Sequence, residues 1–210
     1  MTYTAQRPFL KNHKVHDFHQ SLAKERKVIE SGAHLAVIHQ LNIEFEKLGL
    51  KIDFDSFADN YGSDSLSQFR NKAGVDASFN LISIKTGEVV KEGFTFDYKL
   101  RDPNAVWDDF LAEIVSQDFI RFNSKKPVVQ GWATCKHKIN DAILYILPYH
   151  KKAALVMREE LKKGFDKNRF PLDERRRKIA KNKGWDTISY TIDWDRLQKE
   201  CPRTIIFNYE

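Results

Sequence analysis

The sequence is poor in cysteine, has no long apolar run and begins without an apolar leader. Its 210 residues contain only Cys135 and Cys201, without the paired spacing of metal ligands. A disulfide framework or a structural zinc site is therefore disfavoured, and a reducing compartment is expected. No run approaches the ~18 apolar residues that a membrane-spanning helix needs, and residues 1–8 lack the apolar core of a secretion signal. We therefore expect a soluble, cytoplasmic protein with no membrane partner.

Three signatures of nucleotide or ester chemistry are also absent. The sequence has no Walker phosphate loop, no G-x-G-x-x-G turn and no G-x-S-x-G elbow, so nucleotide-driven and serine-hydrolase functions have no support. What is present is a globular composition, with 41% hydrophobic and 12% aromatic residues. A chain of this length and composition can bury a good core in a single domain.

The positive charge is concentrated in one stretch. The chain has 35 Lys and Arg against 29 Asp and Glu, a net charge of +6. Between Arg158 and Lys183 there are 11 basic and 5 acidic residues, which leaves 24 of each sign elsewhere. The whole excess therefore lies in residues 158–183. This stretch is either a solvated surface or a polyanion-binding arm.

Hydrophobic periodicity predicts one mixed α/β domain over residues 1–210, with helical N-terminal decoration. Its parts would be a helical N-terminal decoration over 1–50, a core sheet over 70–160 and a basic C-terminal part over 161–210. Residues 51–72 are expected to be a connector, and 165–184 a basic loop or helix. The expected helices are 14–29, 35–48, 105–115, 158–164 and 193–200, and the expected strands are 75–84, 89–100, 117–123, 129–135, 141–147, 153–157, 188–192 and 204–209.

Two acids and a lysine mark the strand pair 75–84 and 89–100. Asp76 begins the first strand, and Asp97 and Lys99 stand near the end of the second. Side chains at positions 97 and 99 share one face because strand side chains alternate. Two carboxylates that can share a divalent metal, with an amine beside them, are the minimal set for hydrolysing a phosphodiester. A surface ion pair with Asp76 as a turn residue is the structural alternative.

The pattern Asp76…Asp97-Tyr98-Lys99 resembles the PD-(D/E)XK nuclease superfamily, in particular its small phage-type members. The features that add to this resemblance are Arg101-Asp102, the expected helix with Leu111-Ala112-Glu113, Gly131-Trp132, and Asp141 to Tyr145. It covers about residues 70–160, and Val75 stands where the family has a proline. The resemblance implies a restriction-endonuclease-like fold, in which a mixed central β-sheet is flanked by helices, and a source in a bacterium or a phage-infected host cell.

The resemblance also implies a metal-dependent endonuclease acting on DNA. Asp76, Asp97 and the backbone carbonyl of Tyr98 would hold Mg²⁺, with Mn²⁺ as an alternative. Lys99 would act as a base or as an electrostatic stabiliser, and Glu113 would join the catalytic group from the following helix. Glu44 or Glu46 could supply an upstream acid. RNA instead of DNA, the specificity and the endo or exo mode stay open.

Cations elsewhere are candidates for gripping the nucleic acid. Arg101 projects from the same strand face as Lys99 and could clamp a phosphate, and Lys136 lies in a basic loop. The run Arg175, Arg176, Arg177 and Lys178 is the strongest DNA-binding candidate because clustered cations release counterions from the phosphate backbone. A homodimer is one way for a small active site to cut two strands. Trp132 could stack on a base or lie in the core.

Two other classes of function compete with the nuclease. The chain could be a non-catalytic nucleic-acid-binding protein on the same fold, with structural acids. It could also be an interaction protein that inhibits a host nucleic-acid machine. The presence of Asp76, Asp97 and Lys99 together favours the enzyme.

Overall fold

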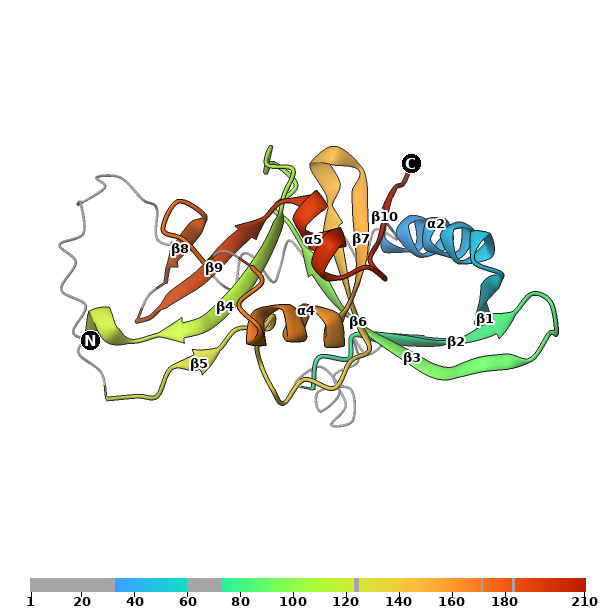
Figure 1. The fold of residues 1–210 in the computed structure, drawn as a ribbon, viewed down its shortest axis with the longest axis horizontal. Coiled ribbons are helices and arrows are strands. Elements are labelled where there is room, and N and C mark those ends of the chain that lie inside the picture. The colour runs from blue at the N-terminus through green and yellow to red at the C-terminus, as the bar shows by residue number, and fades with distance from the viewer. Residues whose placement is uncertain (1–32, 60–72, 123–124, 171, 183) are drawn as a thin grey trace.

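The computed structural model describes residues 33–59, 73–122, 125–170, 172–182 and 184–210. The first expected helix, residues 14–29, lies outside the described residues. None of the helices in these ranges is long and apolar enough to cross a membrane. The described chain folds as a mixed α+β structure with two sheets and three α-helices (Figure 1).

A six-stranded mixed sheet forms the centre, in the order β1-β2-β3-β6-β7-β10. The pair of β3 and β6 is parallel, and the other neighbours are antiparallel. The sheet therefore includes strands from before and from after residues 70–160, the range expected to form the core sheet. Its strands are β1 (Leu50–Asp59), β2 (Ala77–Ser83), β3 (Val89–Leu100), β6 (Ala142–Leu147), β7 (Lys152–Met157) and β10 (Ile205–Asn208).

A second, four-stranded antiparallel sheet was not foreseen from the sequence. Its order is β5-β4-β9-β8, and it lies to the left in Figure 1, with the β1–β2–β3 end of the central sheet on the right and β6 and β7 between them. Its strands are β4 (Phe110–Asp118), β5 (Val129–Gln130), β8 (Arg177–Lys181) and β9 (Asp186–Ile192).

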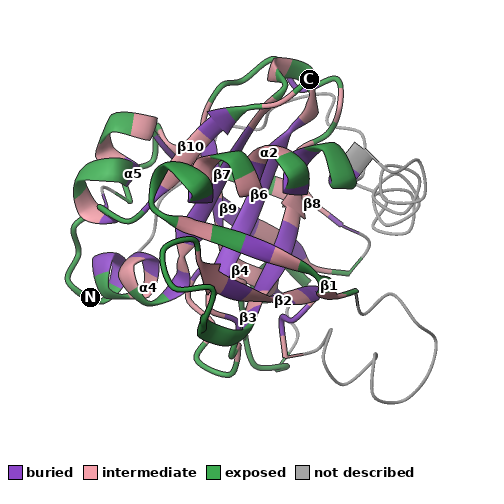
Figure 2. Cartoon of the chain, turned by 90° about the vertical axis from the view of Figure 1, so that its right-hand side faces the viewer, coloured by how far each residue is buried: buried purple, intermediate pink, exposed green. Residues whose placement is uncertain are grey.

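One face of the central sheet is covered by α2 (Ala33–Lys47), as Figure 2 shows. Apolar residues on one side of α2, including Ile38, Leu41 and Phe45, are buried against β2, β3 and β6. Gly49 ends the helix with φ of 76°, a left-handed conformation that glycine adopts without strain. The predicted helix and its glycine stop are confirmed.

The opposite face packs against the second sheet and two further helices, α4 (Arg158–Asp166) and α5 (Trp194–Glu200). Phe110 of β4, Ile143 and Tyr145 of β6, and Leu161 of α4 are buried together in this second core. Both helices lie where the sequence predicted them. The central sheet is consequently buried on two faces at β6, where all six residues are buried.

Three expected elements are wrong. The connector over 51–72 is strand β1 as far as Asp59, with Ile52 buried and the turn-forming Asp55 exposed on an edge strand. The helix over 105–115 is instead a loop followed by β4, whose Phe110 and Ala112 are buried at period two and which pairs with β9. Residues 177–181, expected as loop or helix, form β8 because they pair with β9.

Two of the short strands expected after β4 are also different. Within 117–123, residues 117–118 complete β4 and a 3-10 turn follows at Ile120–Phe122. Within 129–135, only β5 is a strand, and the residues that follow it form a turn.

Asp141 ties the start of β6 to β3. Its Oδ2 accepts hydrogen bonds from the backbone N–H of Thr95 at 2.9 Å and from the Thr95 hydroxyl at 3.0 Å, and its Oδ1 lies 3.1 Å from Nζ of Lys91. These bonds fix the register of the parallel pair that carries Asp97.

Replacing Asp141 with alanine should therefore destabilise the fold. We expect Asp141→Ala to lower the free energy of unfolding by about 1–3 kcal/mol, since it leaves the Thr95 donors without an acceptor. The control, Glu92→Ala on the exposed part of β3, should change it by less than about 0.5 kcal/mol. Urea unfolding measures both, and equal losses would contradict this role for Asp141.

Candidate active site

Asp76 stands directly before β2 and turns its carboxyl group toward β3. Its backbone N–H donates to the Phe96 carbonyl at 2.9 Å, which extends the β2–β3 pairing by one residue. Its Oδ2 accepts the backbone N–H of Tyr98 at 2.8 Å. The ring of Tyr98 lies in the core under α2, so the site receives only the backbone of this residue.

Asp97 and Lys99 share one face of β3, as strand alternation predicts. Nζ of Lys99 lies 2.6 Å from Oδ1 of Asp97. Asp97 is only 2% exposed, and its Oδ2 has no hydrogen-bond partner among the described residues. Half of this buried carboxylate is therefore unsatisfied, which is costly unless another group binds it.

The two carboxyl groups are close enough to interact directly. Burial and then the neighbouring charge of Asp97 raise the pKa of Asp76, to about 8 overall. The Lys99 ammonium and the Tyr98 N–H oppose this shift. A carboxyl group so placed keeps its proton more readily, because ionising it would bring two negative charges together.

Glu113 joins this group from the second sheet, because it lies on β4 and not on a helix. Burial raises the pKa of its carboxyl group, while the charge of Lys99 and hydrogen bonds from the Ser116 side chain and the Trp132 backbone lower it. The charge of Asp97 adds to the increase. Glu113 therefore lies near Lys99 and Asp97, but on a strand and not on the predicted helix.

Gly131 and Trp132 connect the site residues of the second sheet with those of the central sheet. A Cβ on Gly131 would lie 2.2 Å from the Glu113 carbonyl oxygen, so only glycine allows this close approach. Trp132 follows, and its ring centroid lies 5.9 Å from Nζ of Lys99, within cation–π distance. Its ring also packs edge-on against Phe110 at 5.8 Å. Trp132 therefore belongs to both the core and the site.

Arg158 is a member of the site that sequence reasoning missed. It is 6% exposed, its Nη2 donates to the Cys135 carbonyl at 2.8 Å, and its Nη1 has no partner among the described residues. Burial lowers its pKa, and the nearby Asp97 charge raises it. In the sequence it is one cation at the edge of a basic stretch, so no signal distinguishes it.

The residues predicted to contact nucleic acid either form ion pairs or are exposed to solvent. Arg101 pairs with Asp109 at 2.6 Å and has a side chain only 11% exposed. Arg176 pairs with Asp193 at 2.7 Å and Arg177 with Glu174 at 2.9 Å. Arg175, Lys178 and Lys136 are exposed.

The two candidate upstream acids are engaged within α2. Glu44 lies 2.6 Å from Nζ of Lys47, and Glu46 accepts from Asn42 at 2.7 Å. No described contact joins either residue to Asp76 or Asp97.

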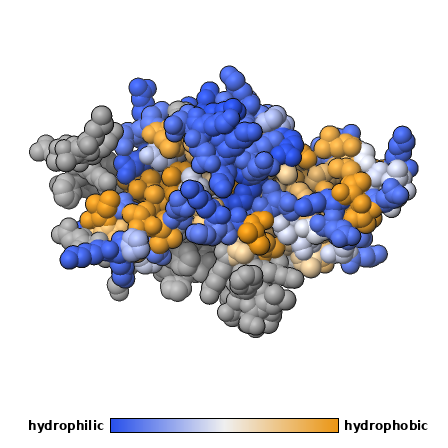
Figure 3. All heavy atoms as spheres, turned by 60° about the horizontal axis from the view of Figure 1, so that its bottom comes forward, coloured by the Kyte–Doolittle hydropathy of each residue, from blue (hydrophilic) through white to orange (hydrophobic). Residues whose placement is uncertain are grey.

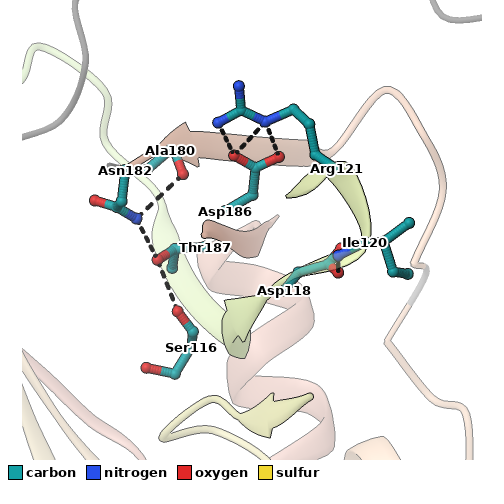
Figure 4. Close-up of polar contacts among 8 residues, drawn as sticks. All are labelled: Ser116, Asp118, Ile120, Arg121, Ala180, Asn182, Asp186 and Thr187. Atoms are coloured by element: carbon teal, nitrogen blue, oxygen red, sulfur yellow. Dashed lines mark hydrogen bonds and ion pairs between the residues drawn. The ribbon is translucent and has the colours of Figure 1, made fainter. Parts of the chain in front are cut away.

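A second pair of buried acids offers an instructive contrast. Asp118 and Asp186 are directly paired across β4 and β9. Asp186 is bound by Arg121, whose Nη2 lies 2.8 Å from Oδ1, and Asp118 accepts the Ile120 N–H at 3.0 Å (Figure 4). Arg121 therefore compensates the charge of Asp186 and Asp118 accepts a backbone N–H, whereas Oδ2 of Asp97 has no hydrogen-bond partner among the described residues.

The donor set fits a hard divalent cation through two carboxylates. Asp97 offers an unpartnered, buried oxygen and Asp76 a second carboxyl group beside it, and Mg²⁺ prefers such oxygen ligands. Within the described ranges, no group of three His, Cys, Asp or Glu side chains has the arrangement of a metal site. The protein would therefore supply two carboxylates, with other oxygens coming from substrate or solvent, as is usual for Mg²⁺.

No family model, curated protein or solved structure matches this chain.

The close contact at Gly131 yields a stability prediction. Gly131→Ala should lower the free energy of unfolding by about 1–3 kcal/mol, because the added methyl group would overlap the Glu113 backbone. Lys136→Ala, in the same connection but exposed, should leave it nearly unchanged. Thermal unfolding of both variants measures the difference, and a neutral Gly131→Ala would contradict the packing.

The metal-free protein should lose stability as the pH rises from about 4 to about 8. In this window the unfolded chain ionises Asp76 at its ordinary pKa of 3.8, while the folded chain keeps the proton to about 8. Asp76→Asn removes this penalty, so its stability relative to the natural chain should rise between pH 5 and pH 8. Urea unfolding with EDTA measures this, with the exposed Asp195→Asn as control. A pH-independent difference would refute the shifted pKa.

Proposed function

We propose that this protein is a metal-dependent nuclease that hydrolyses phosphodiester bonds of DNA. The observation that carries the proposal is the convergence of Asp76, Asp97, Lys99 and Glu113 from three separate segments at one largely buried place. A buried carboxylate with an unsatisfied oxygen is not needed for folding, and such costs are typical of functional sites.

Asp76 and Asp97 would hold Mg²⁺ or Mn²⁺. When bound, such an ion polarises the phosphate and stabilises the charge that builds up during hydrolysis. A divalent cation between the two carboxyl groups would also offset the repulsion that keeps Asp76 protonated.

Lys99 fits the role of electrostatic stabiliser better than that of base. Its ammonium group lies 2.6 Å from the Asp97 carboxylate and faces the Trp132 ring, and both contacts favour the charged form. A charged lysine can bind a phosphate oxygen but cannot accept a proton. Glu113, whose pKa burial raises, is placed to move a proton near Lys99.

The assignment to the PD-(D/E)XK superfamily has support and one opposing feature. Support comes from the β2–β3 hairpin that carries Asp76 and Asp97-x-Lys99, followed by β6 parallel to β3. The helix expected after Lys99 is replaced by β4 and a second sheet. We therefore propose a restriction-endonuclease-like core into which a second sheet is inserted. A homodimer would allow cleavage of both strands.

The proposal predicts metal-dependent cleavage that requires Asp97. With Mg²⁺ or Mn²⁺, the natural chain should nick plasmid DNA or shorten single-stranded DNA, and EDTA should stop it. Asp97→Asn keeps the shape of the side chain and should reduce the rate by at least about 10²-fold. Glu92→Gln, exposed on the same strand, should retain full activity.

The competing functions make different predictions in the same experiment. If the natural chain and Asp97→Asn bind DNA equally and neither cuts any substrate, the protein is a non-catalytic binding protein. If neither binds nucleic acid in a salt-dependent way, an interaction with another protein becomes the better explanation.

A further inference from the structure

A basic groove opens where α4 begins. It has a volume of about 530 Å³ and is lined by part of β3, by residues 138–141 and by the first turn of α4. Two of its lining residues are acidic, Asp141 and Glu159, and five are basic: Lys91, Lys138, Arg158, Lys162 and Arg203. In Figure 3, the middle of the face that includes α4 is hydrophilic, between two more hydrophobic areas. The groove therefore has the charge of an anion site.

The helix terminus in this groove lacks a cap. The N-cap residue of α4 is Met157, whose side chain forms no capping hydrogen bond. The N–H of Arg158 donates to the Asp141 carbonyl at 3.0 Å, but the next two N–H groups have no acceptor within the helix. Uncapped N–H groups together with the positive end of the helix dipole attract phosphate.

Arg158 provides the second, independent indication of a ligand. It lines the groove, is 6% exposed, and keeps Nη1 without a partner among the described residues. A buried guanidinium donor without an acceptor is rare in a finished fold. The same side chain feels the charge of Asp97, so the groove adjoins the candidate active site.

Lys138 links the groove to the other acid of the site. Its side chain packs over Gly74, where a Cβ would lie 2.6 Å from Lys138 Cδ, and Gly74 has φ of 80°. Gly74 precedes Asp76 by two residues, and the Ile139 N–H donates to the Ala73 carbonyl at 3.0 Å. The groove is thus continuous with the segment that carries Asp76.

Lys91 and Arg203 form ion pairs with described residues, and one acid opposes an anion. Lys91 lies 3.1 Å from Asp141, and Arg203 lies 2.6 Å from Glu160. The Glu159 side chain is 86% exposed, and its carboxylate lies 3.9 Å from Nη2 of Arg203 at the edge of the groove. Lys162 forms no ion pair with any described residue, so it remains able to bind a phosphate.

We infer that this groove binds a backbone phosphate of the substrate strand next to the bond that is cut. The inference rests on the proposed nuclease function and names the contact that holds the strand in place. The buried Phe94 and the Met157 side chain supply an apolar surface for the adjoining sugar or base. Lys162, the α4 N–H groups and Arg158 supply the positive side.

Binding can be measured without cleavage in the Asp97→Asn chain. A fluorescent single strand of about 12 nucleotides, bound in EDTA, reports affinity by anisotropy. Lys162→Ala should weaken binding about three- to tenfold and lower the salt slope by about 0.7. Glu159→Gln should tighten binding, because it removes a negative charge at the groove. The matched control is Lys163→Ala, the neighbouring exposed lysine of the same helix, which does not line the groove.

The outcomes separate this inference from the proposed function. Equal effects of Lys162→Ala and Lys163→Ala, or no gain from Glu159→Gln, would overturn the groove assignment even if the natural chain cuts DNA. The expected binding pattern in a protein that never cuts would keep the groove and reject the nuclease. Inorganic phosphate that displaces the strand at equal phosphate concentration would mean a free-anion site and overturn the strand assignment.

Discussion

The repulsion between Asp76 and Asp97 is the constraint on which the rest of the site depends. Two carboxyl groups meet at the junction of β2 and β3, and one of them is almost fully buried. Burying a charge without full compensation is unfavourable. Lys99 compensates from the same strand and Arg158 from the start of α4. Oδ2 of Asp97 nevertheless has no partner among the described residues, whereas the buried Asp186 is bound by the Arg121 guanidinium.

The second sheet covers the face of the central sheet that carries the site. Without β4, Asp97 and Lys99 would lie on an open face of the central sheet, where water would screen their charges. The contact of Gly131 with the Glu113 backbone holds β4 and the following turn together, and Trp132 then closes over Lys99. The site is a property of the junction between two sheets and cannot be attributed to either alone.

The sequence predicted correctly those elements whose hydrophobic pattern lies within the element itself. The alternation in residues 75–100 located β2, β3 and the shared face of Asp97 and Lys99, since side-chain direction follows directly from strand geometry. The spacing of Val106, Phe110, Leu111 and Ile114 predicted a helix, but pairing with the distant β9 made residues 110–118 a strand. In β1 Asp53 and Asp55 suggested a turn, yet both belong to an edge strand and Asp55 is exposed there. Arg158 could not be predicted from the sequence, because its role depends on its burial beside Asp97 in the folded chain.

The pairing of β4 with β9 also has a consequence for how the protein forms. Leu111 pairs with Thr191 and Phe207 of β10 with Ala153, so both sheets are completed by strands from the last part of the chain. Such a topology has high contact order and is expected to fold slowly, because long loops must close before their contacts form. During synthesis, the hairpin with Asp76 and Asp97 leaves the ribosome long before the strand that positions Glu113. The acid cluster can therefore be assembled only after β9 has been synthesised.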